Sequence, residues 1–348
     1  MANPTISAGY PKALLDFAVS RGADRQALLA RSHIHHEELL NQDNRIPLAN
    51  YIALLHAGVA LCNEPALALL FGEAVKLPDI SIVGMMGQLA GNSEEARGQI
   101  SRYGRLALDE DEGDPSDLME VVRDGSDLWL RSTSRLYVEH PLLTESAFAR
   151  CVCGVRAMIA SMPTLAHMRF PKAIHFTHKE PAYRAEYDRI FGVPLVFESD
   201  MNAIVVDEAL MQVSLPSPNP YLSEVLRAHA EGLLENLDRS KSLRGRVESL
   251  LIPGLHTGQT NMDTIARKLA LSRQTLFRKL KAEGVTFEKV LDDLRHKLAI
   301  HYLSDKKASV NETAYLVGFS EPAAFSRAFK RWTGSSPRTM RGAKVGNG

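Results

Sequence analysis

The sequence predicts two domains of different class: an α+β N-terminal domain that is helix-rich with a small sheet, and an all-α C-terminal domain. Three observations support this. Charge is unevenly distributed along the 348 residues, although 41 basic and 41 acidic side chains cancel overall. Apolar residues recur at helical spacing in the first part of the chain, and few segments alternate as strands do. A weak internal repeat runs through the C-terminal part.

The N-terminal part opens with helices. Apolar residues at helical spacing mark segments 14–18, 27–31, 48–62, 66–75 and 84–90. Asn92 precedes two glutamates, as the capping residue of a further helix does. The uncharged run 46–63 has one apolar face and includes Pro47, so we expect an amphipathic helix and not a membrane span. No basic and apolar leader precedes it, and we expect a cytoplasmic protein.

Strands are expected only later in this part. Two short apolar runs flank Asp124 and Gly125, a pair typical of hairpin turns. Further strands are predicted at 168–176, 195–197 and 203–206, with a helix over 183–191 between them. A last helix, over 221–238, carries leucines along one stripe. That stripe either packs on its own domain or forms a seam with another domain or a second copy.

The net charge of zero is the sum of a negative N-terminal part and a positive C-terminal part. Residues 1–241 hold 22 basic and 32 acidic side chains, a net charge of −10, and residues 242–348 hold 19 and 9, a net charge of +10. Such asymmetry is typical of chains that contact nucleic acid. Basic residues spread over solvated helix faces would give the same count, so charge alone leaves both interpretations open.

The basic part contains a repeat with a period of about 48 residues. Ala266 aligns with Ala314, and Arg278 aligns with Arg327 after one inserted residue. Each copy has the pattern of a short helix, a tight turn and a second helix, the outline of a helix-turn-helix motif that places its second helix in the DNA major groove. Between the copies, residues 287–303 predict one long helix that holds the two motifs in fixed relation.

Capping residues mark where the second helices begin. In the first copy Ser272 is placed to cap a helix over 273–283. In the second copy Ser309 caps the first helix, Gly318 supplies the turn, and Ser320 is expected to cap a helix that opens with an acid and a proline.

The outward faces of these second helices suit the reading of base edges, because arginine can bridge guanine and glutamine can pair with adenine. On the first, the outward residues are Arg273, Gln274, Phe277, Arg278 and Lys281. On the second, they are Glu321, Ala323, Ser326, Arg327 and Lys330.

Residues 271–284 and 309–337 resemble the signature of the DNA-binding domain of the AraC/XylS family of bacterial transcription regulators. The resemblance covers roughly residues 243–342. It implies that the base-facing positions are Gln274, Phe277 and Arg278 in the first copy and Pro322, Ala323 and Arg327 in the second. Proline and alanine cannot form bidentate hydrogen bonds, so we expect specificity to depend mainly on the first copy.

Residues 45–51, 180–197 and 202–207 resemble the ornithine-utilisation-regulator-like subgroup of this family, whose N-terminal domain is of the arabinose-binding type. The many early strands of the jelly-roll pocket in other members are missing. The resemblance implies an effector-sensing and dimerisation domain, expected over 1–238, and over 247–348 an AraC-type DNA-binding domain with two helix-turn-helix motifs. Residues 239–246 are the candidate linker between them.

Catalytic and metal sites are not expected. No nucleophile elbow, phosphate loop or nucleotide fingerprint appears, so we predict no enzyme and no cofactor. The three histidines at 33, 35 and 36 do not share a helix face. The acidic run 109–114 resembles a calcium loop, but Asp114 occupies the position that requires glycine. Cys151 and Cys153 diverge on a predicted helix, which favours buried thiols.

The sequence therefore predicts a homodimeric transcription regulator that binds double-stranded promoter DNA. A small-molecule effector on the N-terminal domain would modulate promoter binding or contact with RNA polymerase, with activation as the working hypothesis and repression left open. The alternatives are a constitutive architectural DNA-binding protein without a ligand, and a catalytic N-terminal domain.

Overall fold

The computed structural model describes residues 4–110, 119–165, 168–213, 219–256, 260–304 and 308–343. The chain divides into two compact units, Met1–Leu234 and Glu235–Gly348, and the division falls within helix α11, Pro220–Lys241. Residues 111–114 of the acidic run lie outside the described residues.

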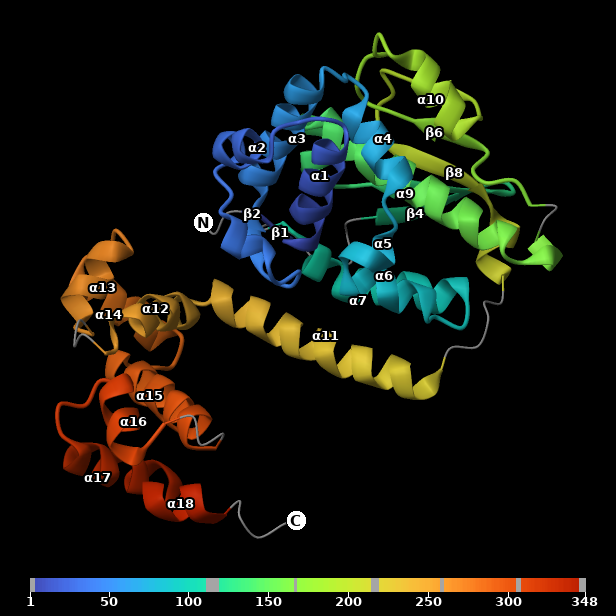
Figure 1. Ribbon diagram of the computed structural model, residues 1–348. Helices are drawn as coiled ribbons and strands as arrows, with labels where there is room; N and C mark the ends of the chain where they lie inside the picture. The colour runs from blue at the N-terminus through green and yellow to red at the C-terminus, as the bar shows by residue number, and fades with distance from the viewer. Residues whose placement is uncertain are drawn as a thin grey trace. The chain divides into compact units, whose positions relative to one another are not determined.

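Helices make up most of the N-terminal unit (Figure 1). Asp24 and Asn92 cap α2 and α7 by accepting from the backbone N–H groups of Ala27 and Glu95, each at 2.7 Å, which confirms the predicted start after Asn92. Before α11 the helices are α1 (Gly9–Ser20), α2 (Arg25–Ser32), η1 (His36–Leu39), α3 (Leu48–Cys62), α4 (Leu67–Ala74), α5 (Leu77–Ile80), α6 (Ile82–Gln88), α7 (Ser93–Ala107), α8 (Arg135–Glu139), α9 (Pro141–Ala160), η3 (Pro163–Leu165), α10 (Arg184–Phe191) and η4 (Glu208–Gln212).

A five-stranded sheet contains all the predicted strands. Its order is β4–β5–β8–β6–β7, and all neighbours are antiparallel except β6 and β7. The predicted hairpin is confirmed: Asp124 pairs with Asp127 across a turn in which Gly125 has a φ of +63°. The strands are β4 (Met119–Asp124), β5 (Asp127–Ser132), β6 (Ala173–His175), β7 (Leu195–Val196) and β8 (Ala203–Asp207).

The strand predicted over 168–176 is too long. It begins only at Ala173 because Pro171 has no N–H to donate to a neighbouring strand, and the carbonyl of Phe170 accepts from Arg156 Nε at 2.7 Å. A second sheet was not predicted. It is three-stranded and antiparallel, in the order β2–β1–β3, from β1 (Thr5–Ser7), β2 (Arg45–Pro47) and β3 (Leu108–Asp109).

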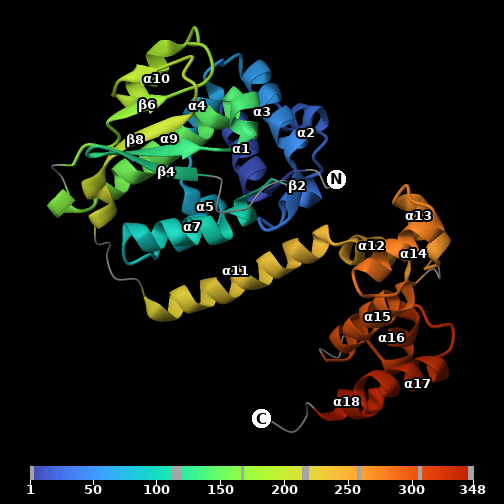
Figure 2. The same cartoon turned by 180° about the vertical axis from the view of Figure 1, so that it is seen from behind.

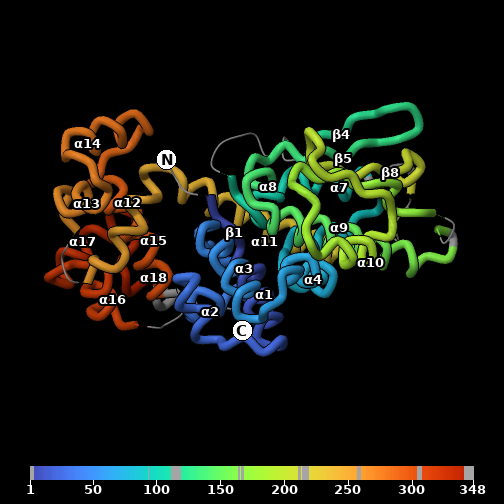
Figure 3. The backbone as a smooth tube through the Cα atoms, turned by 90° about the horizontal axis from the view of Figure 1, so that it is seen from above, coloured from blue at the N-terminus to red at the C-terminus, as the bar shows by residue number. Residues whose placement is uncertain are grey.

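Two apolar cores fill this unit, and α4 contributes to both. Leu67 and Phe71 of α4 pack with α1, α2 and α3, whereas Leu69 and Leu70 pack with α9, α10 and the five-stranded sheet. Helices α1–α3 therefore gather at one end of the unit and the larger sheet at the other, as the views from the front, the back and above agree (Figures 1, 2 and 3).

The C-terminal unit contains the end of α11 and seven α-helices among the described residues, with α15 shared by two cores. Val290 and Leu294 of α15 lie in the first core, and Ala299 and Leu303 lie in the second. The helices are α12 (Leu243–Leu251), η5 (Ile252–Gly254), α13 (Met262–Lys268), α14 (Arg273–Ala282), α15 (Phe287–Ser304), α16 (Val310–Leu316), α17 (Pro322–Thr333) and α18 (Pro337–Ala343).

One predicted cap is wrong. Helix α17 begins at Pro322, so the capping position belongs to Glu321 and not to Ser320, and no side-chain hydrogen bond caps it. The proline ring at the first helical position presets the backbone and has no N–H that needs a partner, so the helix starts without a serine cap.

No single helix within the described residues is long and apolar enough to cross a membrane, although α3 and α4, bent by 106° relative to each other, reach that length together.

Candidate nucleic-acid interface

The first helix-turn-helix consists of α13 and α14. The turn passes through Ala270, whose φ of +54° reverses the chain. Ser272 caps α14 as predicted, because its Oγ accepts from the N–H of Thr275 at 3.1 Å. Leu276 and Leu280 are buried on the inner face of α14 and attach it to α12, α13 and α15. The apolar face thus fixes which side of α14 remains outside.

The five residues predicted on the outer face of α14 are all exposed: Arg273, Gln274, Phe277, Arg278 and Lys281. Phe277 leaves 52% of its surface exposed between basic neighbours, which is unusual for a large apolar side chain. Arg273 Nη1 lies 2.8 Å from Asp263 Oδ2 of α13, an exposed ion pair that it must exchange if it is to contact phosphate.

The second helix-turn-helix consists of α16 and α17. Ser309 and Glu312 form a reciprocal capping box: Ser309 Oγ accepts from the N–H of Glu312 at 3.2 Å, and Glu312 Oε2 accepts from the N–H of Ser309 at 2.7 Å. Gly318 makes the turn with a φ of +82°. Phe325 and Phe329 are fully buried, as the inward pattern predicted.

The second set of predicted residues is exposed in part. Glu321, Ala323, Arg327 and Lys330 are exposed, and Pro322 and Ser326 are half-buried. Ser326 Oγ donates to the carbonyl of Pro322 at 2.9 Å, so this hydroxyl already has a partner within its own helix. The proton of the Ser326 hydroxyl is therefore used within α17.

Arg295 of α15 binds the turn of the second motif, and it is not among the residues predicted from the sequence. Its Nε and Nη2 donate to the carbonyls of Val317 and Gly318, both at 3.1 Å, and its guanidinium lies 4.8 Å from the centroid of the Phe319 ring. Burial lowers the pKa of this arginine, and attraction to Asp292 opposes that shift. The sequence signal that could have indicated Arg295 is its position as a basic residue beside the apolar stripe of the helix predicted over 287–303.

Helix α15 lies between the α13–α14 pair and the α16–α17 pair (Figures 1 and 2). Because both pairs pack on this one helix, the two outward faces belong to a single compact unit. Among the described residues, no group of three or more histidine, cysteine, aspartate or glutamate side chains is arranged to hold a metal ion.

Two family models match the chain. Residues 22–215 match the arabinose-binding domain of AraC transcription regulators, an N-terminal domain, and residues 265–343 match a helix-turn-helix domain. The first match covers more than half of the chain, and the second begins within α13 and takes in α14 and the whole second motif. The predicted resemblance is thereby confirmed.

The chain is also similar to individual proteins. The chain is 29% identical to the ornithine utilization regulator of Pseudomonas aeruginosa over 97% of this chain and 96% of that protein. It is 36% identical to the transcriptional activator RhaS of Escherichia coli over 36% of this chain and 45% of RhaS. The crystal structure of the regulator CdpR from Pseudomonas aeruginosa aligns with a TM-score of 0.38 at 22% identity, covering 91% of this chain and 96% of CdpR. The chain belongs to the AraC family of DNA-binding transcription regulators, and its matched domains are those of a regulator and not of an enzyme.

Proposed function

We propose that this protein recognises specific promoter sequences mainly through α14 and changes transcription in response to an effector on its N-terminal domain. The observation that carries the proposal is the outer face of α14, where Gln274, Phe277 and Arg278 stand exposed on a helix whose opposite side is locked into a core. Base edges in a major groove are read by side chains of this kind at the start of a recognition helix.

The two recognition helices would make different kinds of contact with DNA. On α14, Gln274 and Arg278 would hydrogen-bond base edges, and Arg273 and Lys281 would contact phosphates. On α17, Pro322 and Ala323 offer only apolar contact, with Glu321 and Ser326 beside them, while Arg327 and Lys330 supply positive charge to the backbone. Sequence specificity would then come mainly from the first motif.

Substitution of Arg278 tests this assignment. Arg278→Ala should weaken binding to a DNA sequence selected by the native protein by about 1–3 kcal/mol and relax the choice of base at one position. Lys289→Ala is the control, since Lys289 is exposed on α15 and pairs with Asp293 at 2.6 Å. A footprint and affinity unchanged in Arg278→Ala would contradict the assignment.

We also propose the domain roles that the sequence suggested: effector sensing and dimerisation over 1–238, a linker over 239–246, and DNA binding over 247–348. An exposed apolar face on α11 supports dimerisation. Tyr221, Leu222 and Val225 leave 75%, 44% and 47% of their surfaces exposed, and the small residues Ala228 and Gly232 continue the same face. Val225→Lys should shift the mass measured by sedimentation from dimer to monomer; an unchanged mass would exclude this face.

Effector binding is proposed from the match to the arabinose-binding type of domain. Activation is proposed because RhaS, which is named a transcriptional activator, is 36% identical to this chain over 129 residues. Contact with RNA polymerase and a cytoplasmic location are proposed as the sequence suggested them. The effector would act by favouring one conformation of the regulator, which changes promoter occupancy only as far as its affinities for the two states differ.

A further inference from the structure

Residues 239–246, proposed above as the linker, form a junction between two helices. A single residue, Ser242, separates the end of α11 from the start of α12. Its Oγ donates to the carbonyl of Arg239 at 2.7 Å and accepts from the N–H of Gly245 at 2.9 Å. One side chain thus links the last turn of α11 to the first turn of α12.

The backbones of the two helices are in contact at Gly245. A Cβ added there would lie 1.8 Å from the carbonyl oxygen of Arg239, closer than any real contact allows. Leu237 near the end of α11 and Leu243 at the start of α12 are both buried. A hinge needs residues that are free to change φ and ψ, and these close contacts leave little freedom at the junction.

A residue of the first recognition helix holds the start of α12. Glu283 accepts from the N–H groups of Leu243 and Arg244 through its two carboxylate oxygens, at 2.8 and 3.0 Å. These N–H groups have no partner within their own helix, and the N-terminal end of a helix attracts an anion. Helices α14 and α12 are therefore joined by this contact as well as by the apolar core that they share.

The place of Glu283 on its own helix is unfavourable. It is the C-terminal capping residue of α14, where the helix dipole disfavours a negative charge. Gly284 follows with a φ of +75° and ends the helix at this point. The contact with α12 offsets the unfavourable position, so Glu283 serves the attachment of α12 and not the stability of α14 itself.

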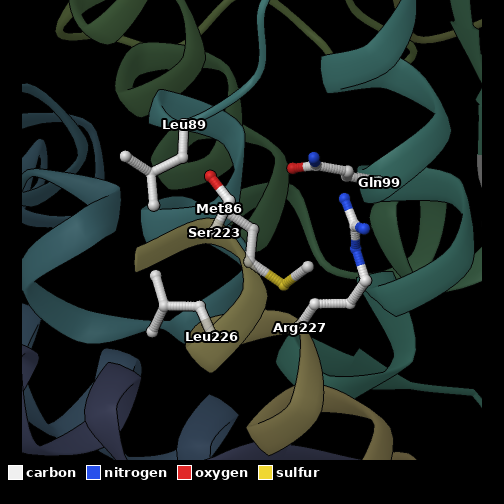
Figure 4. A pocket seen from close by; sticks show the side chains of 6 residues that line it. All are labelled: Met86, Leu89, Gln99, Ser223, Leu226 and Arg227. Carbon is white, nitrogen blue, oxygen red and sulfur yellow. The ribbon is translucent and has the colours of Figure 1, made fainter. Parts of the chain in front are cut away.

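The first part of α11 packs within the N-terminal unit. Glu231 Oε1 accepts from Arg102 Nη2 and from the Tyr103 hydroxyl of α7, both at 2.6 Å. The groove that α11 forms with α6 and α7, lined by residues such as Gln99 and Leu226, has room for about one water molecule (Figure 4). This part of α11 therefore lies close against its neighbours.

We propose that the junction transmits the position of α11 to the first recognition helix, and that Glu283 is the positioning residue that makes it rigid. In the proposed dimer, α11 of each copy would fix where that copy's α14 meets DNA. The junction would thereby set the spacing between the two half-sites that the dimer accepts. An effector that moves α11 would change the accepted spacing and so promoter occupancy. This inference rests on the proposed function and gives its regulation a path through named residues.

The test compares full-length proteins on DNA with one half-site and on DNA with two inverted half-sites at a series of spacings. The native protein should prefer one spacing. A change of two base pairs, about a fifth of a helical turn, should weaken its binding by about tenfold or more, a factor called here the spacing penalty. Glu283→Ala should reduce the spacing penalty to about threefold or less, because α12 can then tilt relative to α14. Its affinity for one half-site should stay within about threefold of the native value, because the base-reading residues are unchanged.

Glu288→Ala is the matched control, since it removes the same charge from an exposed position at the start of α15, and it should keep the native spacing penalty. Glu283→Gln keeps one acceptor and should give an intermediate value. An unchanged spacing penalty in Glu283→Ala would overturn the inference, as would a native protein that binds all spacings equally. Equal losses on one and two half-sites would mean that Glu283 only stabilises the fold, and would overturn it as well.

Hydrogen exchange gives an independent measurement at the junction. The amides of Leu243 and Arg244 should exchange at least about tenfold faster in full-length Glu283→Ala than in the native protein, because each loses its acceptor. In Glu288→Ala they should exchange at the native rate. Unchanged exchange in Glu283→Ala would overturn the assignment to this residue.

The Arg278 substitution keeps the two proposals distinguishable. If Arg278→Ala weakens binding to one half-site while Glu283→Ala keeps the native spacing penalty, the inference fails and the proposed function stands. If Arg278→Ala leaves half-site binding unchanged, the proposed function fails, whichever spacing penalty Glu283→Ala gives.

Discussion

Ala270 and Gly318 occupy the same place in the two helix-turn-helix turns, and only one of them suits it. Both have a left-handed backbone, with φ of +54° and +82°. Alanine is strained there because its Cβ crowds the carbonyl, whereas glycine is not. At Gly318 a Cβ would also lie 2.6 Å from the carbonyl oxygen of Leu255, closer than real contacts allow.

Two separate substitutions, alanine to glycine in the first turn and glycine to alanine in the second, should therefore change the stability in opposite directions. Ala270→Gly should raise the free energy of unfolding of the C-terminal unit by about 0.5–1 kcal/mol by removing strain, and Gly318→Ala should lower it by about 1–3 kcal/mol. Urea unfolding of the full-length protein with Trp129→Phe, in which Trp332 is the one remaining tryptophan, measures both by fluorescence. A loss of stability in Ala270→Gly would show that the turn carries no strain.

Glu145 is a buried carboxyl group in the N-terminal unit. It is 2% exposed on α9, and its Oε1 accepts from the hydroxyls of Tyr183 and Tyr187, both at 2.7 Å. Oε2 is buried and has no partner within the described part of the chain. Burial raises the pKa of Glu145 to about 7, and the two tyrosine hydrogen bonds oppose that shift.

The raised pKa predicts a specific dependence of stability on pH. A carboxyl whose folded pKa lies above its unfolded value contributes stability below about pH 4.5, and this is lost as pH rises through about 7. Glu145→Gln keeps a neutral group of the same shape, so between pH 5 and 8 the native protein should lose up to about 3 kcal/mol relative to the variant.

Comparing the native protein with Glu145→Gln also cancels the effect of other titrating groups on the pH dependence of stability. His175 and His178 have pKa values lowered mainly by burial, which gives the opposite dependence on pH, but both proteins contain them. Thermal or urea unfolding at each pH measures the difference in the free energy of unfolding. Parallel curves for the two proteins would show that Glu145 is charged in the folded state.

The second helix-turn-helix depends on α15 through Arg295. Arg295→Ala removes two part-buried hydrogen bonds to turn carbonyls and a cation–π contact, and should lower the free energy of unfolding by about 1–3 kcal/mol. Arg331→Ala is a control at the same pair of helices, since it removes only an exposed ion pair from α17 to Asp292, at 2.8 Å. That change should cost less than about 1 kcal/mol. Equal losses would indicate that Arg295 acts only as a surface charge.

The elements that the sequence predicted well are those with local signals. Ser272, Ser309 and Asn92 cap helices as expected, because capping needs only residues three positions apart. Helix α9, which was expected only around Cys151 and Cys153, has no side-chain cap, and Thr144 and Glu145 are buried among the apolar residues of its inner face. The three-stranded sheet escaped prediction because its strands have two or three residues, too few for alternation to show.

The candidate DNA-contacting residues follow the same rule. Inward leucines and phenylalanines define the opposite face of each recognition helix, and this periodicity correctly predicted which side of α14 is exposed. It does not reveal contacts that depend on side-chain conformation, such as Arg273 with Asp263 or Ser326 with its own helix. Tyr103 of α7 and Glu231 of α11 meet, at 2.6 Å between the hydroxyl and Oε1, only because the two helices pack together, which no local pattern encodes.

The two parts of the chain carry opposite net charge. The part up to residue 241 carries −10 and the part from 242 carries +10. The basic part has its own helices and cores: α12 begins at Leu243 with Ser242 as its cap, and Gly245 N–H donates to Ser242 Oγ at 2.9 Å. A fragment from residue 242 therefore retains the caps and cores that build its fold.

Opposite charges on one chain predict that the acidic part competes with DNA phosphates for the basic part. The fragment 242–348 should then bind a single half-site DNA more tightly than the full-length protein at low salt. Salt shortens the Debye length, which is about 10 Å at 0.1 M, so the ratio of the two affinities should approach one as salt is raised. Added salt also makes counterion release less favourable and so weakens DNA binding by both proteins. This effect acts on the same phosphate contacts in both, so it leaves the ratio unaffected. Affinities measured by fluorescence anisotropy across a salt series test this, and a ratio that does not change with salt would mean that the two charges do not compete.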